Sequence, residues 1–247
     1  MNEPLSGIAI LKQLTRPEWL LQPQGDFSLF QKHPTFNAKW NLGKPWVVCY
    51  DKNAMYLGAA SNVKLGVGPF SHIEKPDFVD QAGLWSLFLY EPPKELASLP
   101  PIAPYGLSWQ YTPVMHYLAQ TGYKFDLKEA YLFAEQHAVL RRFYEQMKEL
   151  RERDKPAAKA IYTRTFGVLA HQPPEHWSNA LYRPDWFFGL VAEAKVRMYL
   201  QVQKTYRSDG VLPITIDVDS LYFDQDVPSI PIGSGIGQFK IIRATPE

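Results

Sequence analysis

The segment Pro213–Phe223 (PITIDVDSLYF) places two carboxylates in a run that otherwise suits a buried β-hairpin. Because alternate side chains of a strand share a face, we expect Asp217 and Asp219 on one face and Val218, with the preceding isoleucines, on the other. Burying two like charges side by side is costly unless a cation neutralises them. Oxygen ligands favour Mg²⁺ or Mn²⁺, so the pattern indicates a divalent-metal site at the end of a strand.

The composition is that of a folded protein with a large core. The chain has 247 residues, including 14 Phe, 7 Trp and 14 Tyr, enough for one large domain or two lobes built on one core. The net charge is only +1, so a polyanion-binding surface would have to be local. The single cysteine, Cys49, lies in an apolar run and is predicted to be a core residue. With no signal-like N-terminus and no apolar run near 20 residues, we expect a soluble, cytoplasmic protein with no membrane contact.

A third carboxylate follows another apolar strand. Residues 45–50 (PWVVCY) are apolar on both faces, which predicts a central strand that ends at Asp51. If this strand neighbours the Asp217–Asp219 hairpin, three carboxylates meet at one sheet edge. Such a group can hold two metal ions roughly 3.5–4 Å apart and support phosphoryl displacement. The alternative is that Asp51 only ends a strand and that the other two aspartates form a turn.

Hydrophobic periodicity predicts helices in the second half of the chain. An apolar stripe predicts a long helix over 127–153, and a second helix over 157–170 completes a helical hairpin. Three glycines near the C-terminus predict a turn rather than a nucleotide loop, because no helix follows them. The remaining predicted elements are strands at 84–90 and 109–112 and helices at 113–120 and 186–204.

The helical hairpin carries a local basic excess. Between residues 141 and 164 there are eight basic and four acidic residues, which suits phosphate binding but also a solvated helix with ion pairs. In its second helix Lys159, Thr163 and Phe166 lie at i, i+4 and i+7, so a cation, a hydroxyl and an aromatic ring share a face that suits a triphosphate and a base. Gly167 would let a backbone or base approach closely. The alternative is a solvated lysine beside an apolar helix face.

Taken in order, these segments resemble the palm and fingers of family B DNA polymerases. Residues 51–56 (DKNAMY) resemble that family's first palm motif, Asp-x-x-Ser-Leu-Tyr. Residues 159–167 (KAIYTRTFG) resemble the fingers motif Lys-x3-Asn-Ser-x-Tyr-Gly, and residues 217–220 (DVDS) resemble Asp-Thr-Asp-Ser. The resemblance spans about 46–247 and is strongest to shortened, polymerase-like proteins of mobile elements or linear replicons. The chain departs from the motifs at Thr163, Arg164, Phe166 and Val218.

The resemblance implies an α/β (α+β) fold, a polymerase-like palm with an antiparallel sheet and helical-hairpin fingers. Residues 1–44 would form an N-terminal extension packed on the palm. The palm would comprise 45–125 and 171–247, and the fingers 126–170. Residues 1–50 carry no Asp-x-Glu exonuclease motif, so we expect no proofreading. The family continues into a DNA-gripping thumb beyond the region matched here, so we expect a protein partner or oligomer to replace it.

The resemblance also implies a two-metal site. Asp51 and Asp219 would be the main ligands of two Mg²⁺ or Mn²⁺ ions, with Asp217 secondary and the backbone carbonyl of Lys52 a further ligand. On a DNA primer–template, a primer 3′-OH would attack the α-phosphate of a deoxynucleoside triphosphate. Metals and cations, rather than covalent catalysis, would stabilise the transition state.

The implied nucleotide site combines the palm and the fingers. Lys159 would contact the triphosphate, Phe166 would offer a face to the base, and Tyr56 would pack under the sugar and exclude a 2′-hydroxyl. The full implied set is Tyr56, Lys159, Thr163, Phe166, Gly167, Arg141 and Arg142, the two arginines joining Lys159 at the triphosphate.

Two other functions remain compatible with these residues. One is a non-catalytic DNA-binding, regulatory or replication accessory protein on a polymerase-derived core, which would bind DNA through the basic hairpin without incorporating nucleotides. The other is a metal-dependent nuclease that uses the same aspartates, which would degrade labelled DNA with metal and no nucleotide present.

Overall fold

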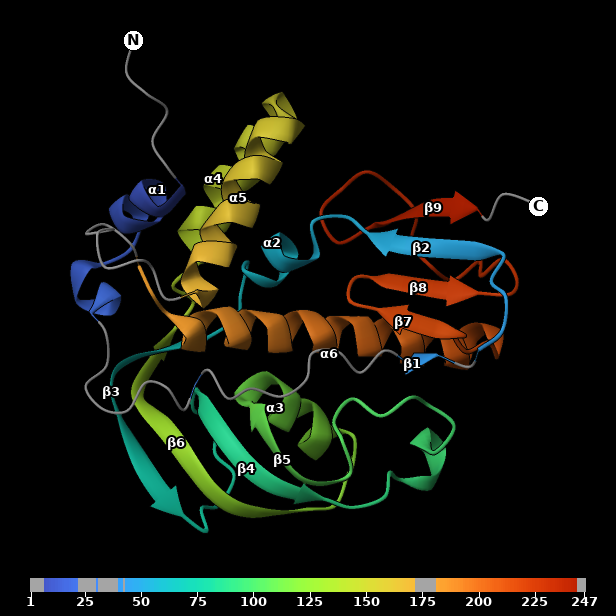
Figure 1. Ribbon diagram of the computed structural model, residues 1–247, viewed down its shortest axis with the longest axis horizontal. Coiled ribbons are helices and arrows are strands. Elements are labelled where there is room, and N and C mark those ends of the chain that lie inside the picture. The colour runs from blue at the N-terminus through green and yellow to red at the C-terminus, as the bar shows by residue number, and fades with distance from the viewer. Residues whose placement is uncertain (1–6, 22–29, 31–39, 42, 172–180, 244–247) are drawn as a thin grey trace.

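One long helix, α6 (Pro184–Asp209), separates two antiparallel β-sheets in the computed structural model (Figure 1). The structure describes residues 7–21, 30, 40–41, 43–171 and 181–243. The other helices are α1 (Gly7–Leu14), η1 (Pro17–Leu20), α2 (Met55–Ala59), η3 (Lys94–Leu96), α3 (Thr112–Gln120), α4 (Arg141–Arg153) and α5 (Lys155–Ala170). The strands are β1 (Trp40–Asn41), β2 (Val48–Lys52), β3 (Leu65–Glu74), β4 (Gly83–Leu89), β5 (Gly106–Tyr111), β6 (Phe125–His137), β7 (Thr215–Asp217), β8 (Ser220–Phe223) and β9 (Phe239–Arg243). No helix among the described residues is long and apolar enough to span a membrane.

The first sheet has the strand order β1-β7-β8-β2-β9, and β2 lies inside it as predicted. Antiparallel pairing sets Asp51 opposite Ser220 of β8 on one side and opposite Lys240 of β9 on the other. The start of β2 is buried, and Cys49, a free thiol with 2 % exposure, is the core residue that its apolar surroundings predicted. The strand runs one residue beyond Asp51, to Lys52.

The second sheet, of order β3-β6-β4-β5, corrects part of the predicted helical hairpin. Residues 125–137 form strand β6, paired with β3 on one side and β4 on the other, so the predicted helix over 127–153 is wrong in its first half. The stretch FDLKEAYLF alternates Phe125, Leu127, Tyr131 and Phe133 with other residues at a two-residue period that the helical stripe masked. Pairing with β3 and β4 makes this segment a central strand of the second sheet, a contact that the local pattern does not reveal.

The helical hairpin itself is formed by α4 and α5, which project away from both sheets (Figure 1). The side chain of Asp154 accepts a hydrogen bond from the amide of Ala157 at 3.0 Å, and Pro156 lies in the first turn of α5, so the sequence forces a new helix to begin there. The other predicted elements, β4, β5, α3 and α6, are confirmed with small shifts of their ends. Helix α6 ends at Gly210, whose φ of 68° is a left-handed cap.

A buried arginine joins three segments at the start of α6. Arg183 is fully buried and ion-pairs with Asp185 at 2.7 Å. Its guanidinium also donates to the carbonyls of Trp19 in η1 and Gly66 in β3, both at 2.8 Å, and lies 4.0 Å from the ring centroid of Trp186. Since every one of these contacts is withdrawn from water, the cluster fixes η1, β3 and α6 against one another.

Candidate active site

The carboxylates of the first sheet gather where β2 ends. Asp51 lies next to the end of β2, and the β7–β8 hairpin turns beside it through Val218 and Asp219. The amide of Lys52 donates to the carbonyl oxygen of Asp219 at 2.8 Å, which ties the turn to β2. The two strands are therefore neighbours, as the three-carboxylate hypothesis required, and Asp51 and Asp219 lie at the same end of the sheet.

The turn changes which side chains share a face. Strand β7 ends at Asp217, so the alternation predicted through Asp219 stops there, and Asp219 belongs to the turn. The predicted apolar face is correct for the buried Ile214 and Ile216 but wrong for Val218, which is 39 % exposed. Val218 has a φ of 53°, a left-handed conformation that turns its side chain away from the strand face.

Val218→Gly is expected to stabilise the protein. A β-branched residue with positive φ is strained by roughly 1–2 kcal/mol, and glycine relieves the strain at some cost in chain entropy, so the free energy of unfolding should rise by about 0.5–1 kcal/mol. Urea unfolding of both proteins measures the change. Val79→Gly is the matched control, because Val79 is similarly exposed at 44 % and has no positive φ; its substitution should lower stability. Equal losses in both variants would contradict the assignment of strain to Val218.

The electrostatics of the site are those of crowded acids. Burial, and next the charge of Asp51, raise the pKa of Asp219 above its ordinary value, and Asp217 adds to the effect. Lys240 acts in the opposite direction and forms an ion pair with Asp51, Nζ to Oδ1 at 3.2 Å. The hydroxyl of Ser220 lies 3.5 Å from the other oxygen of Asp51. A cation at this position would relieve the repulsion that raises the pKa of Asp219.

The donor set fits an oxygen-seeking divalent ion only in part. Within the described ranges, no group of three or more His, Cys, Asp and Glu side chains is placed to hold a metal ion, so the expected ligand group of three carboxylates is not assembled. Asp217 ends its strand before the turn, and Asp51 is turned to Lys240. The carboxylates of Asp51 and Asp219, with backbone carbonyls beside them, are nevertheless the oxygen donors that Mg²⁺ and Mn²⁺ prefer.

Tyr56 and Lys52 follow Asp51 closely along the chain, and both have shifted pKa values. Burial, and then the charge of Asp219, raise the pKa of Tyr56, so the tyrosine of the first motif lies near the carboxylate of the last. Burial lowers the pKa of Lys52 to about 8, with the charge of Arg197 as the second cause. The Lys52 ammonium lies 5.2 Å from the ring centroid of Phe239 rather than in an ion pair with either aspartate.

The fingers residues differ in their exposure. Lys159 and Thr163 are exposed on α5, and no atom lies within 4 Å of a Cβ built at Gly167, so this face of the helix is open to an approaching molecule. Phe166 is instead buried, at 4 % exposure, and its ring packs against Phe143 at 5.8 Å and Tyr162 at 6.2 Å between centroids. The expectation that Phe166 offers a free face is therefore wrong for this conformation, because the hairpin uses the ring as its own core.

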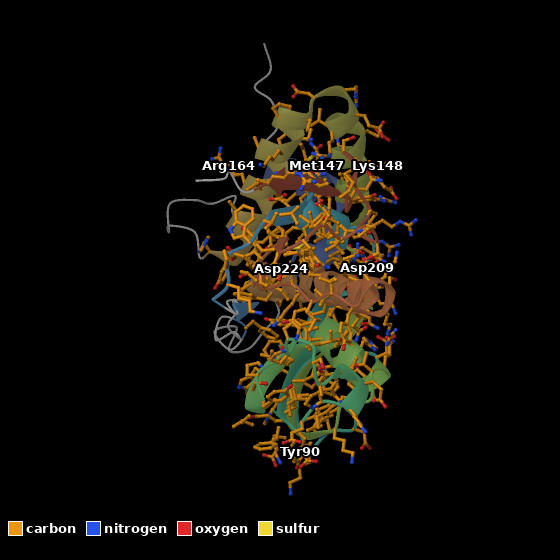
Figure 2. The ribbon with its side chains drawn as sticks, turned by 90° about the vertical axis from the view of Figure 1, so that its right-hand side faces the viewer. Tyr90, Met147, Lys148, Arg164, Asp209 and Asp224 are labelled. Carbon is orange, nitrogen blue, oxygen red and sulfur yellow. The ribbon has the colours of Figure 1, made fainter. Side chains whose placement is uncertain are left out.

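The structure separates the predicted arginines from Lys159. Arg141 and Arg142 are exposed at the start of α4, and Arg141 pairs with Glu145 at 3.2 Å. Because the Phe143–Phe166 contact sets the start of α4 beside the end of α5, these arginines lie roughly 12 Å along the axis from Lys159. Figure 2 shows Lys148 and Arg164 on opposite flanks of the hairpin, so these two basic residues do not share one surface.

A cleft of about 470 Å³ lies between the hairpin and the loop before β9. The cations on its walls are not the ones that the resemblance assigned to the triphosphate. Its lining residues are Tyr144, Lys148, Arg151, Glu152, Lys155, Ser234, Gly235 and Ile236. Lys148, Arg151 and Lys155 were counted only as part of the basic excess, and no spacing rule distinguished them from the other bases of the hairpin.

Tyr162 is a site residue that the sequence did not reveal. Burial raises its pKa first, the charge of Arg151 lowers it, and the charge of Asp219 raises it again. The pKa of this α5 side chain therefore responds both to a cation of the cleft and to a palm carboxylate. Its position within the fingers motif, one residue before Thr163, was the available signal, but the motif leaves that position unspecified.

Two antiparallel sheets, a carboxylate pair at the end of a central strand and a helical hairpin beside it define a polymerase-like fold. The chain is similar to solved structures of Phi29 DNA polymerase. The complex with primer–template DNA and incoming nucleotide substrates aligns with a TM-score of 0.65 at 13 % identity, over 96 % of this chain and 52 % of that one. The orthorhombic crystal form aligns with a TM-score of 0.60 at 12 % identity, over 93 % and 49 %. The chain thus spans about half the length of those polymerases; no family model and no curated protein matches it.

Proposed function

We propose that the protein is a metal-dependent DNA nucleotidyltransferase, a template-directed DNA polymerase of the family B type without proofreading. The observation that carries the proposal is the meeting of Asp51 and Asp219 at the end of β2 and the β7–β8 turn. These residues come from the two palm motifs that the sequence suggested independently of the fold. Burial, and next the charge of Asp51, raise the pKa of Asp219, which supports a site built to receive cations.

The residues have distinct proposed roles. Asp51 and Asp219 would hold Mg²⁺ or Mn²⁺, with Asp217 contributing charge from beside the turn, and the metal would supply stabilisation of the oxygens that attack and leave. The chain's own part is to position the substrates and to neutralise charge. Lys240 holds the Asp51 carboxylate in place through its 3.2 Å ion pair, and Lys159 and Thr163 present a cation and a hydroxyl on the open face of α5.

The proposed partners are a DNA primer–template and deoxynucleoside triphosphates. The solved relatives include polymerases complexed with primer–template DNA and with single-stranded DNA, which supports a DNA-binding role for the same fold. A protein partner or a second copy would supply the grip of a thumb, and we propose action in the cytoplasm.

A labelled primer–template, tested with and without deoxynucleotides in Mg²⁺ or Mn²⁺, distinguishes the candidate functions. Nucleotide-dependent extension by the wild type, lost in Asp219→Ala, supports the proposal. Degradation without nucleotides indicates a nuclease that uses the same aspartates. Binding of the duplex by the protein, with neither extension nor degradation, indicates a non-catalytic DNA-binding protein. Extension that Asp219→Ala retains would contradict the assigned site.

Tyr56→Ala is expected to relax sugar selection. Burial and then the charge of Asp219 raise the pKa of Tyr56, which supports a position near the site where the ring would block a 2′-hydroxyl. Its removal should raise ribonucleotide incorporation relative to deoxynucleotide incorporation, on the order of 10–10²-fold in the ratio of kcat/KM. Tyr105→Ala removes an exposed tyrosine elsewhere and should leave the ratio unchanged. Equal rejection of ribonucleotides by wild type and Tyr56→Ala would exclude Tyr56 as the gate.

A further inference from the structure

The loop Ile232–Gln238 is fastened to the turn that follows β2. Asn53, which is 9 % exposed, makes three hydrogen bonds to it, each of 2.8 Å. Its amide N–H donates to the carbonyl of Gln238, its side-chain Nδ2 donates to the carbonyl of Gly233, and its own carbonyl accepts from the amide of Gly237. The side chain makes one of these three bonds, and its loss would leave the carbonyl of Gly233 without this donor, so we treat Asn53 as a structural anchor of the loop.

Consecutive residues at the end of β2 hold two different segments. The amide of Lys52 donates to the carbonyl of Asp219, in the carboxylate turn, and the amide of Asn53 donates to the carbonyl of Gln238, in the loop. One stretch of backbone therefore sets the positions of both the carboxylate turn and the loop. A displacement of the loop cannot leave the end of β2 unaffected.

The loop is stiffened from within by a glutamine. Oε1 of Gln238 accepts a hydrogen bond from the amide of Gly235 at 2.8 Å. A Cβ on Gly233 or Gly235 would collide with the Gln238 amide group, and Gly237 has a φ of +80°. The three glycines are thus explained by the turn that the sequence predicted and by the packing of Gln238, so the loop has one defined shape.

The opposite side of the loop contacts the helical hairpin. Nη2 of Arg151 donates to the carbonyl of Ser234 at 3.3 Å across the basic cleft. Ile236 packs over α2, where a Cβ on Gly58 would come within 3.3 Å of it. The loop therefore bridges two places, the end of β2 and the α4–α5 hairpin. On α5, burial raises the pKa of Tyr162 and the charge of Arg151 lowers it.

We propose that the loop 232–238 is a strut that sets the resting position of the α4–α5 hairpin over the carboxylate site. Asn53 is its positioning residue, and the Arg151–Ser234 hydrogen bond is its contact with the hairpin. Neither residue needs to touch a reacting atom. Their effect is to fix the width of the cleft through which the fingers face the palm.

Amide hydrogen exchange of the full chain tests the strut without requiring any activity. Asn53→Ala should raise exchange about tenfold in the loop 232–238 and around the hairpin tip, near residues 148–158, while α6 keeps its protection. Arg151→Gln changes a side chain whose hydrogen bond to Ser234 is exposed, so the fold should be retained. It should raise exchange at the hairpin tip but not in the loop. Gln120→Ala, which removes an exposed amide side chain at the end of α3, should do neither. Loosening of the loop in Asn53→Ala with an unchanged tip, or an unchanged tip in Arg151→Gln, would overturn the proposal.

The kinetic consequence rests on the proposed function. Both variants should raise KM for the nucleotide by about tenfold with a smaller change in kcat. The double variant should be no worse than the worse single one, because the two hydrogen bonds act in series through the same loop. Additive losses would overturn a shared strut. Absence of nucleotide incorporation by the wild type would overturn the proposed function alone, since hydrogen exchange then still decides whether the strut exists.

Discussion

Asp219→Asn is expected to abolish most nucleotide incorporation while making the protein more stable at neutral pH. On the proposed function, the loss of a charge that would hold the metal should lower kcat on the order of 10²–10³-fold. Burial and the charge of Asp51 raise the pKa of Asp219, so the ionised carboxylate is less favourable in the folded than in the unfolded chain. Removing that charge should raise the free energy of unfolding, the opposite sign from a substitution that damages the fold.

The pH dependence of this effect distinguishes it from other causes. The penalty for ionised Asp219 is absent below the unfolded-state pKa of about 3.9 and grows as the pH rises through the raised folded-state pKa. The stability difference between Asp219→Asn and wild type should therefore increase from pH 3 to pH 7 in urea unfolding. Asp224→Asn, an exposed control, should show neither the activity loss nor this trend. A difference that is independent of pH would contradict the origin assigned to it.

Asp185→Ala is expected to lower the free energy of unfolding by about 3–5 kcal/mol. The substitution leaves the Arg183 guanidinium charged, fully buried and without its carboxylate, held only by backbone carbonyls and the ring of Trp186. Urea denaturation measures the change. The effect should extend to η1 and β3, since Arg183 joins both to α6.

An exposed ion pair supplies the control. Glu145→Ala breaks the ion pair with Arg141, in which the arginine side chain is 68 % exposed and the glutamate side chain 54 %. It should lower the free energy of unfolding by only about 0.3–0.5 kcal/mol. Replacing both members of the buried pair by apolar residues of similar volume should cost much less than Asp185→Ala alone. Similar losses in Asp185→Ala and Glu145→Ala would show that the buried charge is compensated by other contacts.

Local sequence patterns predicted those elements whose apolar residues fit a single period. The central strand β2, the β7–β8 hairpin and helices α3, α5 and α6 follow from runs of apolar residues bounded by Pro, Gly and Asp. Strand β6 was mistaken for a helix because its apolar residues fit both periods, and only its pairing with β3 and β4 decides between them. Tertiary contacts of this kind cannot be predicted from a short segment of the sequence, because the paired residues are distant along the chain.

The same distinction between local pattern and tertiary contact applies to the candidate site. The motifs predicted that Asp51 and Asp219 would meet and that Tyr56 would lie near them. They did not predict the ion pair of Asp51 with Lys240, which depends on β9 lying beside β2. Nor could they place Arg141 and Arg142 far from Lys159, because that separation arises from the antiparallel packing of α4 on α5.

Helix α6 determines how cooperatively the two lobes of the molecule unfold. The same 26-residue helix packs against α2 and α5 on the side of the first sheet and against α3, β3 and β5 on the side of the second. Removing either sheet would expose one whole flank of α6 to water, so neither lobe retains a complete core by itself. The two lobes are therefore halves of one cooperative unit, and loss of order in the sheet remote from the carboxylates is transmitted to them through a single shared helix.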